Sequence, residues 1–286
     1  MRELCKLIRE SDIRTRLGRL PKGLTGVYDE IIHSIKSQPN CNFDIAIRAL
    51  QWVLVSTRPL KPGELAMAAE LNPSTAGDHF ALDLLQEPAS ALEVDLLIHA
   101  CGGLLPLDTI LDVIRFSYHS VQEYLETRSE IWDIDVVDAQ LFVSESCLWV
   151  LHYGHSLSLP LYEYAALNWY KHCRSYQDLV LATNIKHTKH KLSIPLLNRF
   201  LGSFKQASTS YIEWANWVDK YDSNPLHCIR STPLCPAFST AFASLWELVA
   251  WLWDFGGGSI EVRNDGDDSL LHVSRRHGSA WIIAKI

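Results

Sequence analysis

The side chains with the clearest potential for chemistry are two pairs of histidines, each spaced three residues apart. His152 and His155 form the first pair, and His187 and His190 form the second. Two imidazoles at this spacing can hold a metal ion when a third ligand converges on them. Neither pair has an obvious third ligand in the sequence, and lysines surround the second pair. The sequence therefore predicts no metal site here, and the second pair is typical of a solvated basic loop.

Other catalytic signatures do not occur in the sequence. There is no phosphate-binding G-x-x-x-x-G-K-[ST] motif and no G-x-S-x-G motif, which would present a nucleophilic serine. Neighbouring carboxylates, such as Asp133 with Asp135 and Asp267 with Asp268, are more typical of exposed turns than of acid–base machinery. We expect no catalytic residue, no cofactor and no enzymatic activity. The alternative is a hydrolase or nucleotide-binding enzyme that lacks a standard motif.

Composition favours a globular chain in the cytoplasm. Hydrophobic residues make up 48% of the 286 residues, which is enough to bury a core, and the length predicts about two domains. No segment has the length and apolar character of a membrane span or a secretory signal. The seven cysteines are scattered and include no C-x-x-C pair. We therefore expect a cytoplasmic protein with reduced thiols and no membrane partner.

Hydrophobic periodicity divides the first half of the chain into a lead-in and a domain. Residues 1–42 end in an amphipathic helix, in which Tyr28 and Ile35 share one face. In residues 43–128, three helices are expected to precede two short strands and a further helix. The first helix is expected near residue 46, the second from Pro62 onward and the third over 89–100. The two strands are expected over 104–107 and 113–116, and the last helix over 120–127. Three helices followed by a two-stranded wing is the order of a winged helix.

Charge indicates what such a winged helix can bind. Residues 43–128 contain 5 Lys or Arg and 12 Asp or Glu, so their net charge of −7 equals that of the whole chain. The third helix carries Glu93 and Asp95 and no Lys or Arg, and the wing adds Asp108 and Asp112. These carboxylates would repel the phosphates of DNA. We therefore expect no nucleic-acid partner, and we expect the four carboxylates to form a docking surface for a protein.

Side-chain spacing also assigns apolar positions to the core. In the third helix, Leu92, Leu96 and Leu97 are expected to face inward. Residues 129–221 predict a helical connector, whose second helix carries an aromatic stripe with Tyr164 and Trp169. This stripe is expected to pack in the core, with a groove for a protein partner as the alternative. A later amphipathic helix is expected to pack inward through three apolar positions: Ile212, Trp214 and Trp217.

Five motifs in the first half of the chain carry a resemblance to a known family. They are Leu20-Pro-Lys-Gly-Leu-Thr-Gly-Val-Tyr28, Ala49-Leu-Gln-Trp52, Arg58-Pro-Leu60, Cys101-Gly-Gly-Leu-Leu105 and Val113-Ile-Arg-Phe-Ser117-Tyr-His-Ser-Val121. Together they resemble the winged-helix domain named after GPI inositol-deacylase, which follows the nucleotide-binding NACHT module in large fungal signalling ATPases. The resemblance covers roughly residues 15–128. It implies a winged helix that packs on a NACHT module and helps to hold an inactive state, without deacylase activity.

Residues 222–286 resemble ankyrin repeats, whose units open on D-G-x-T-P-L-H. The two candidate openings end in Pro225, Leu226 and His227 and in Leu271 and His272. The two histidines are 45 residues apart, against an ankyrin period of about 33, so we infer an insertion between them. The resemblance implies that both histidines hydrogen-bond within turns and that the repeats bind a protein.

The sequence thus predicts a mainly α protein in four parts. These are a helical lead-in (1–42), a winged-helix domain with a short β-wing (43–128), a helical connector (129–221) and truncated ankyrin-like repeats (222–286). By resemblance, the chain is a non-enzymatic, regulatory part of a fungal NACHT–ankyrin (STAND-type) signalling protein. We expect it to be cut at both ends, as a truncated gene product, with a genuine short protein as the alternative.

Overall fold

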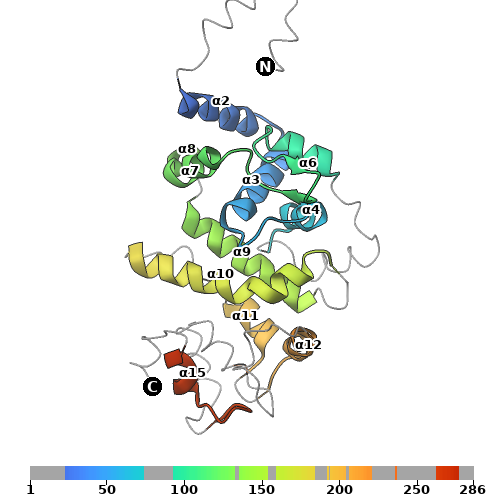
Figure 1. Ribbon diagram of the computed structural model, residues 1–286, viewed down its shortest axis with the longest axis vertical. Helices are drawn as coiled ribbons and strands as arrows, with labels where there is room; N and C mark the ends of the chain where they lie inside the picture. Colours follow the sequence, from blue (N-terminus) through green and yellow to red (C-terminus); the bar gives the residue numbers. More distant parts are fainter. Residues whose placement is uncertain are drawn as a thin grey trace, which may run out of the picture.

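The helices of this protein form three layers along its long axis (Figure 1). The computed structural model describes residues 23–73, 93–132, 135–153, 159–183, 192, 194–203, 206–220, 236 and 262–276. The described helices between residues 24 and 132 form the first layer, those between residues 136 and 183 the second, and those between residues 194 and 218, together with 270–276, the third. A single hydrophobic core cluster extends through all three layers, from Tyr28 to Val273. The expectation of a mainly α protein is confirmed.

Helix α2 (Leu24–Lys36) attaches the lead-in to the first layer. It buries the face that periodicity predicts, with Tyr28, Ile32 and Ile35 in the core. The Tyr28 hydroxyl lies 2.8 Å from Oγ of Ser120, and Tyr124 donates a hydrogen bond of 2.7 Å to Oδ1 of Asp29. These contacts connect α2 to the helix that follows the wing.

Helices α3 (Asn40–Val55) and α4 (Pro62–Glu70) pack against each other beneath α2. Pro62 occupies the first turn of α4 as expected, because an N–H at that position would have no partner within the helix. Glu64 closes the same turn, and its Oε2 accepts a hydrogen bond of 2.8 Å from the Lys61 amide. Glu64 is only 3% exposed, and two hydrogen bonds of 2.8 and 2.7 Å from the Arg58 guanidinium balance its charge.

Helix α6 (Val94–Ala100) is the part of the expected third helix that the structure describes; residues 89–92, which include Leu92, lie outside the described residues. Leu97 faces the core as expected. The expectation for Leu96 is wrong, because this residue is 58% exposed. Adjacent positions on a helix point roughly 100° apart, so the side that places Leu97 in the core turns Leu96 toward solvent.

The segment expected to be a wing contains an antiparallel pair of short strands, β1 (Leu107–Asp108) and β2 (Val113–Ile114), and we use the word wing for this hairpin. The Ile114 amide donates a hydrogen bond of 2.8 Å to the carbonyl of Leu60, so the wing is tied to the segment that leads into α4. The first strand is shorter than expected, because Leu104 and Leu105 are buried in the turn that follows α6. Helices α7 (His119–Thr127) and α8 (Ser129–Trp132) come after the wing.

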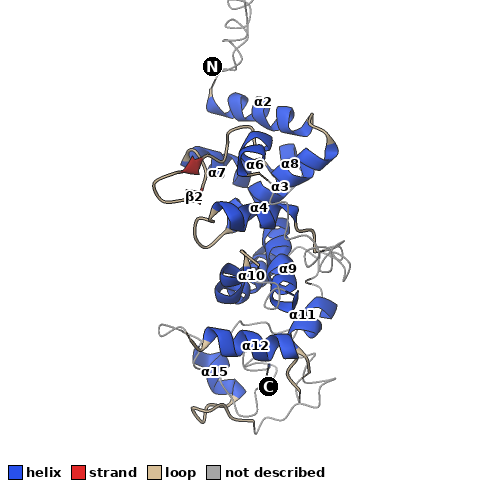
Figure 2. Cartoon of the chain, turned by 90° about the vertical axis from the view of Figure 1, so that its right-hand side faces the viewer, coloured by secondary structure: helices blue, strands red, loops and turns tan. Residues whose placement is uncertain are grey.

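Helices α9 (Val136–Tyr153) and α10 (Tyr162–Thr183) pack along each other below the first layer (Figures 1 and 2). Tyr164 and Trp169 are 0% and 1% exposed. The aromatic stripe of α10 therefore belongs to the core, and these two side chains do not line a groove for a partner, because neither reaches the surface.

Helices α11 (Ile194–Leu201) and α12 (Thr209–Val218) extend the aromatic core. The ring of Trp214 lies 5.7 Å from that of Trp169, and its N–H donates a hydrogen bond of 3.0 Å to the carbonyl of Ala166. The inward orientation expected for Ile212 is wrong: this residue is 39% exposed, because Tyr211 and Trp214 occupy the inner face of α12.

Helix α15 (Leu270–Arg276) lies in the third layer, below α10 in both views (Figures 1 and 2). Leu270 and Val273 turn toward the core, whereas Leu271 is 41% exposed. Among the helices that the structure describes, none combines the length and the apolar character that a membrane crossing requires.

Candidate functional site

The tip of the wing presents two aliphatic side chains to solvent. Ile110 is 92% exposed and Leu111 is 64% exposed. Tight turns usually select Gly, Asn, Asp or Ser for reasons of backbone geometry, which do not explain an aliphatic pair. This aliphatic pair is visible in the sequence between Thr109 and Asp112, although the docking surface expected from the sequence comprises only the neighbouring carboxylates. We refer to Ile110 and Leu111 together as the wing tip.

Asp108 organises the turn that carries the wing tip. Its Oδ1 accepts hydrogen bonds from the amides of Ile110 (3.1 Å) and Leu111 (3.2 Å), and its Oδ2 lies 2.8 Å from the Arg115 guanidinium. The Leu111 amide, followed by the Ile110 amide and Arg115, holds the pKa of Asp108 below its usual value. The charge of Asp108 is therefore engaged within the wing.

The other three predicted carboxylates are exposed. Glu93 immediately precedes α6, Asp95 lies in its first turn, and Asp112 follows the wing tip with a left-handed backbone (φ 52°). The structure thus divides the four carboxylates between two elements, α6 and the wing. Their joint role as a docking surface stays a prediction.

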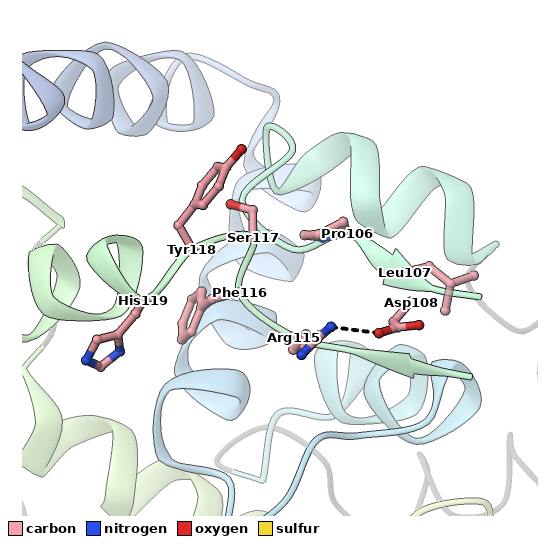
Figure 3. A pocket seen from close by; sticks show the side chains of 8 residues that line it. All are labelled: Pro106, Leu107, Asp108, Arg115, Phe116, Ser117, Tyr118 and His119. Atoms are coloured by element: carbon pink, nitrogen blue, oxygen red, sulfur yellow. Dashed lines mark hydrogen bonds and ion pairs between the residues drawn. The ribbon is translucent and has the colours of Figure 1, made fainter. Parts of the chain in front are cut away.

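A pocket of about 450 Å³ lies beside the wing strands (Figure 3). Its apolar walls come from Pro106, Leu107, Phe116 and Tyr118. Two ionisable side chains that line it already have partners: Arg115 pairs with Asp108, and the Nε2 of His119 lies 3.5 Å from Glu123. The pocket is therefore better suited to receive a side chain than to activate a nucleophile.

The two histidine pairs of the sequence can be followed only in part, because the structure describes just one of the four side chains. His152 is described, and its Nδ1 lies 3.3 Å from Oγ of Ser210. His155, His187 and His190 lie outside the described residues. Within the described ranges, no group of three His, Cys, Asp or Glu side chains could hold a metal ion.

A partly buried polar network joins the first two layers, and no sequence pattern predicted it. The hydroxyl of Thr57, an exposed residue just after α3, donates a hydrogen bond of 2.8 Å to Oδ1 of Asn168 in α10. The Thr57 amide donates one of 3.0 Å to the hydroxyl oxygen of Tyr164, which also contacts His172. Because these partners are more than 100 residues apart in sequence, local spacing carries no signal of their contact.

One histidine and three cysteines in the core are held in their neutral forms. Burial lowers the pKa of His172 to about 3, and burial raises the pKa values of Cys101 and Cys173 to about 12. Burial also raises the pKa of Cys147. A neutral thiol is a poor nucleophile and a poor metal ligand. These groups therefore act as packing and hydrogen-bonding residues.

His272, in the first turn of α15, hydrogen-bonds to Ser269, the residue that precedes the helix. Its Nδ1 accepts a hydrogen bond of 3.3 Å from the Ser269 amide and lies 2.8 Å from the Ser269 hydroxyl oxygen. One turn earlier, Oδ1 of Asn264 accepts hydrogen bonds from the amides of Gly266 and Asp268. The other predicted turn residues, Pro225, Leu226 and His227, lie outside the described residues.

Comparison with known proteins adds no assignment, since no family model, no curated protein and no solved structure matches this chain. The function must therefore be argued from the geometry of the wing, of α6 and of the turn before α15.

Proposed function

We propose that this chain is a non-enzymatic regulatory module that binds proteins, as its resemblance to fungal NACHT–ankyrin signalling proteins implies. In this proposal, residues 43–128 form a winged helix that packs on a nucleotide-binding module. Residues 222–286 form ankyrin-like repeats that bind a protein partner in the cytoplasm. The observation that carries the proposal is the wing, which follows α3, α4 and α6 and presents aliphatic side chains to solvent.

The charge of α6 supports a protein partner over DNA. In DNA-binding winged helices, the third helix approaches the duplex and needs Lys or Arg to contact phosphate. Here the exposed charged positions at the start of α6 are Glu93 and Asp95. Their negative charge opposes phosphate, whereas it complements a basic protein surface.

The turn before α15 supports the ankyrin part of the proposal. The contact between Ser269 and His272 agrees with the turn hydrogen bonding that the resemblance implies for the histidine. An isolated bridge between Arg263 and Ser269 closes the turn, and Arg276 forms hydrogen bonds of 3.0 and 3.2 Å with Asp268. A pre-ordered turn of this kind is a feature that a repeat needs in order to stack.

The direct test is calorimetric titration of the full chain with the purified NACHT module of a fungal NACHT–ankyrin protein, in the presence of ADP and then of ATP. Saturable binding in either nucleotide state supports the proposal, and absence of binding in both contradicts it. Tight binding of ATP or GTP by the chain alone would favour the enzyme alternative. Salt-dependent binding of duplex DNA would favour a nucleic-acid adaptor.

Charge reversal tests the contribution of α6. The variant Glu93→Lys/Asp95→Lys should weaken binding of the NACHT module, most strongly at low salt, because exposed charges are screened as ionic strength rises. Glu163→Lys/Asp178→Lys on α10 changes the net charge equally at another exposed site and serves as the control. Equal affinities of the two variants would remove α6 from the interface.

A further inference from the structure

The wing tip is the most exposed aliphatic pair on the described surface, and it is fixed in place. The carboxylate of Asp108 accepts the amide hydrogen bonds of both tip residues, and Arg115 holds that carboxylate. Asp112 closes the loop with a φ of 52°, a conformation that costs a non-glycine residue free energy. A loop that is ordered in advance loses little conformational entropy when it binds. Its rigidity therefore favours tight insertion into a partner.

The charges next to the wing tip indicate the chemistry of that partner. Asp112 directly follows the tip and is exposed, while the nearby Arg115 is already paired with Asp108. The surrounding block, residues 43–128, has a net charge of −7. An anionic lipid surface and a nucleic acid would both be repelled. A protein pocket with apolar walls and a rim of Lys or Arg complements this arrangement.

We infer that the wing tip inserts, as an apolar anchor with an acidic flank, into an apolar pocket with a basic rim on the partner protein. This inference rests on the proposed function and specifies the contact through which the winged helix docks on the nucleotide-binding module. The docking surface then differs from the carboxylate surface expected from the sequence. Ile110 and Leu111 supply the binding energy, Asp112 orients the contact, and Asp108 holds the turn in shape.

Surface beside the wing strands can add to the contact that the tip makes. A stable interface buries roughly 800 Å² on each partner, which two side chains do not reach. Tyr118 is 70% exposed and lines the pocket of about 450 Å³ beside the wing strands, so a further side chain of the partner can enter the surface there (Figure 3). Interface energy usually concentrates in a few central apolar side chains, with polar contacts around them.

The test compares the affinities of four forms of the full chain for the NACHT module: wild type, Ile110→Ser/Leu111→Ser, Asp112→Lys and Ile212→Ser. The double variant should bind at least about 30-fold more weakly, because two aliphatic side chains lose their burial at the interface. Asp112→Lys should weaken binding at low salt and approach the wild-type affinity at high salt. Ile212→Ser, a similar change at an exposed position of α12, should bind like the wild type.

The outcomes separate this inference from the proposed function. If the wild type binds and the double variant binds equally well, the wing tip is not the anchor, although the proposed function stands. If Asp112→Lys tightens binding, the rim of the partner pocket is not basic. If the wild type binds in neither nucleotide state, the proposed function fails and the inference fails with it. Because Ile110 and Leu111 are largely exposed, the thermal unfolding midpoint of the double variant should stay close to that of the wild type. The midpoints of Ile212→Ser, at a position only 39% exposed, and of Asp112→Lys, at a left-handed backbone position that favours aspartate over lysine, should fall slightly.

Discussion

The hydroxyl oxygen of Tyr164 lies 2.8 Å from Nε2 of His172, and both residues are buried. The other imidazole nitrogen, Nδ1, lies 2.9 Å from Oε1 of Gln140, an atom that can only accept a hydrogen bond. The imidazole proton is therefore on Nδ1, and Tyr164 donates to Nε2. The hydroxyl oxygen of Tyr164 can therefore accept the hydrogen bond that the Thr57 amide donates. One chain of hydrogen bonds thus connects α9, α10 and the segment that leads into α4.

The first prediction concerns the central member of this chain. Tyr164→Phe removes the donor to His172 and the acceptor of the Thr57 amide, so two polar groups lose their partner. We expect the free energy of unfolding to fall by about 2–3 kcal/mol, measured by urea titration. Tyr118→Phe removes a hydroxyl from a residue that is 70% exposed and should have almost no effect. Equal losses in the two variants would contradict the hydrogen-bond chain.

The second prediction is a loss of stability at acid pH through His172. Burial, with a smaller effect of Lys171, lowers the pKa of His172 from 6.5 to about 3. Between these values the unfolded chain binds a proton that the native chain excludes, so stability falls as pH falls. The contribution is fully present above pH 6.5 and is lost toward the native pKa, with a slope of at most about 1.4 kcal/mol per pH unit.

The measurement is urea unfolding on both sides of pH 6.5 for the wild type and for His172→Gln. The variant has no imidazole to protonate, so its free energy of unfolding should depend less steeply on pH in this window. The same pH dependence in both proteins would show that His172 is not the titrating group.

The third prediction concerns the carboxylate of Glu64, which is 3% exposed and bonded to Arg58. Arg58→Met leaves this carboxylate without its counter-charge and should lower the free energy of unfolding by about 2 kcal/mol. Adding Glu64→Gln should restore part of the loss, because a neutral amide is cheaper to bury than a carboxylate. Arg128→Met breaks an exposed pair with Glu130 and should cost less than about 1 kcal/mol. A double variant no more stable than Arg58→Met would refute the charge argument.

The fourth prediction compares two glycines that follow α6. Gly102 and Gly103 both have left-handed backbones, with φ of 61° and 79°. An added Cβ at Gly102 would lie 3.0 Å from Cγ2 of Ile31, whereas one at Gly103 meets nothing within 4 Å. Backbone strain should lower the free energy of unfolding of both alanine variants by about 1 kcal/mol. Gly102→Ala should lose further stability because its Cβ crowds Ile31. Thermal unfolding of the two variants checks this, and equal losses would show that Ile31 yields without cost.

Local patterns predicted the features that depend on neighbouring residues. The buried face of α2, the proline in the first turn of α4 and the glycine stop after α6 are all present. The same patterns failed at Leu96 and Ile212, where an apolar residue lies beside the one that packs. Periodicity identifies a helix, but the packing partner determines which of two adjacent apolar side chains enters the core.

The sequence alone determined the helical nature of the chain, the proline that begins α4, the glycines that follow α6 and the acidic character of residues 43–128. Only the tertiary structure decided which charges are free, because Asp108 is paired across the wing while Asp112 is exposed. It also decided that the wing tip is exposed and that Tyr164 and His172 meet Thr57. These features depend on distances and burial created by packing, and residue spacing along the chain does not encode them.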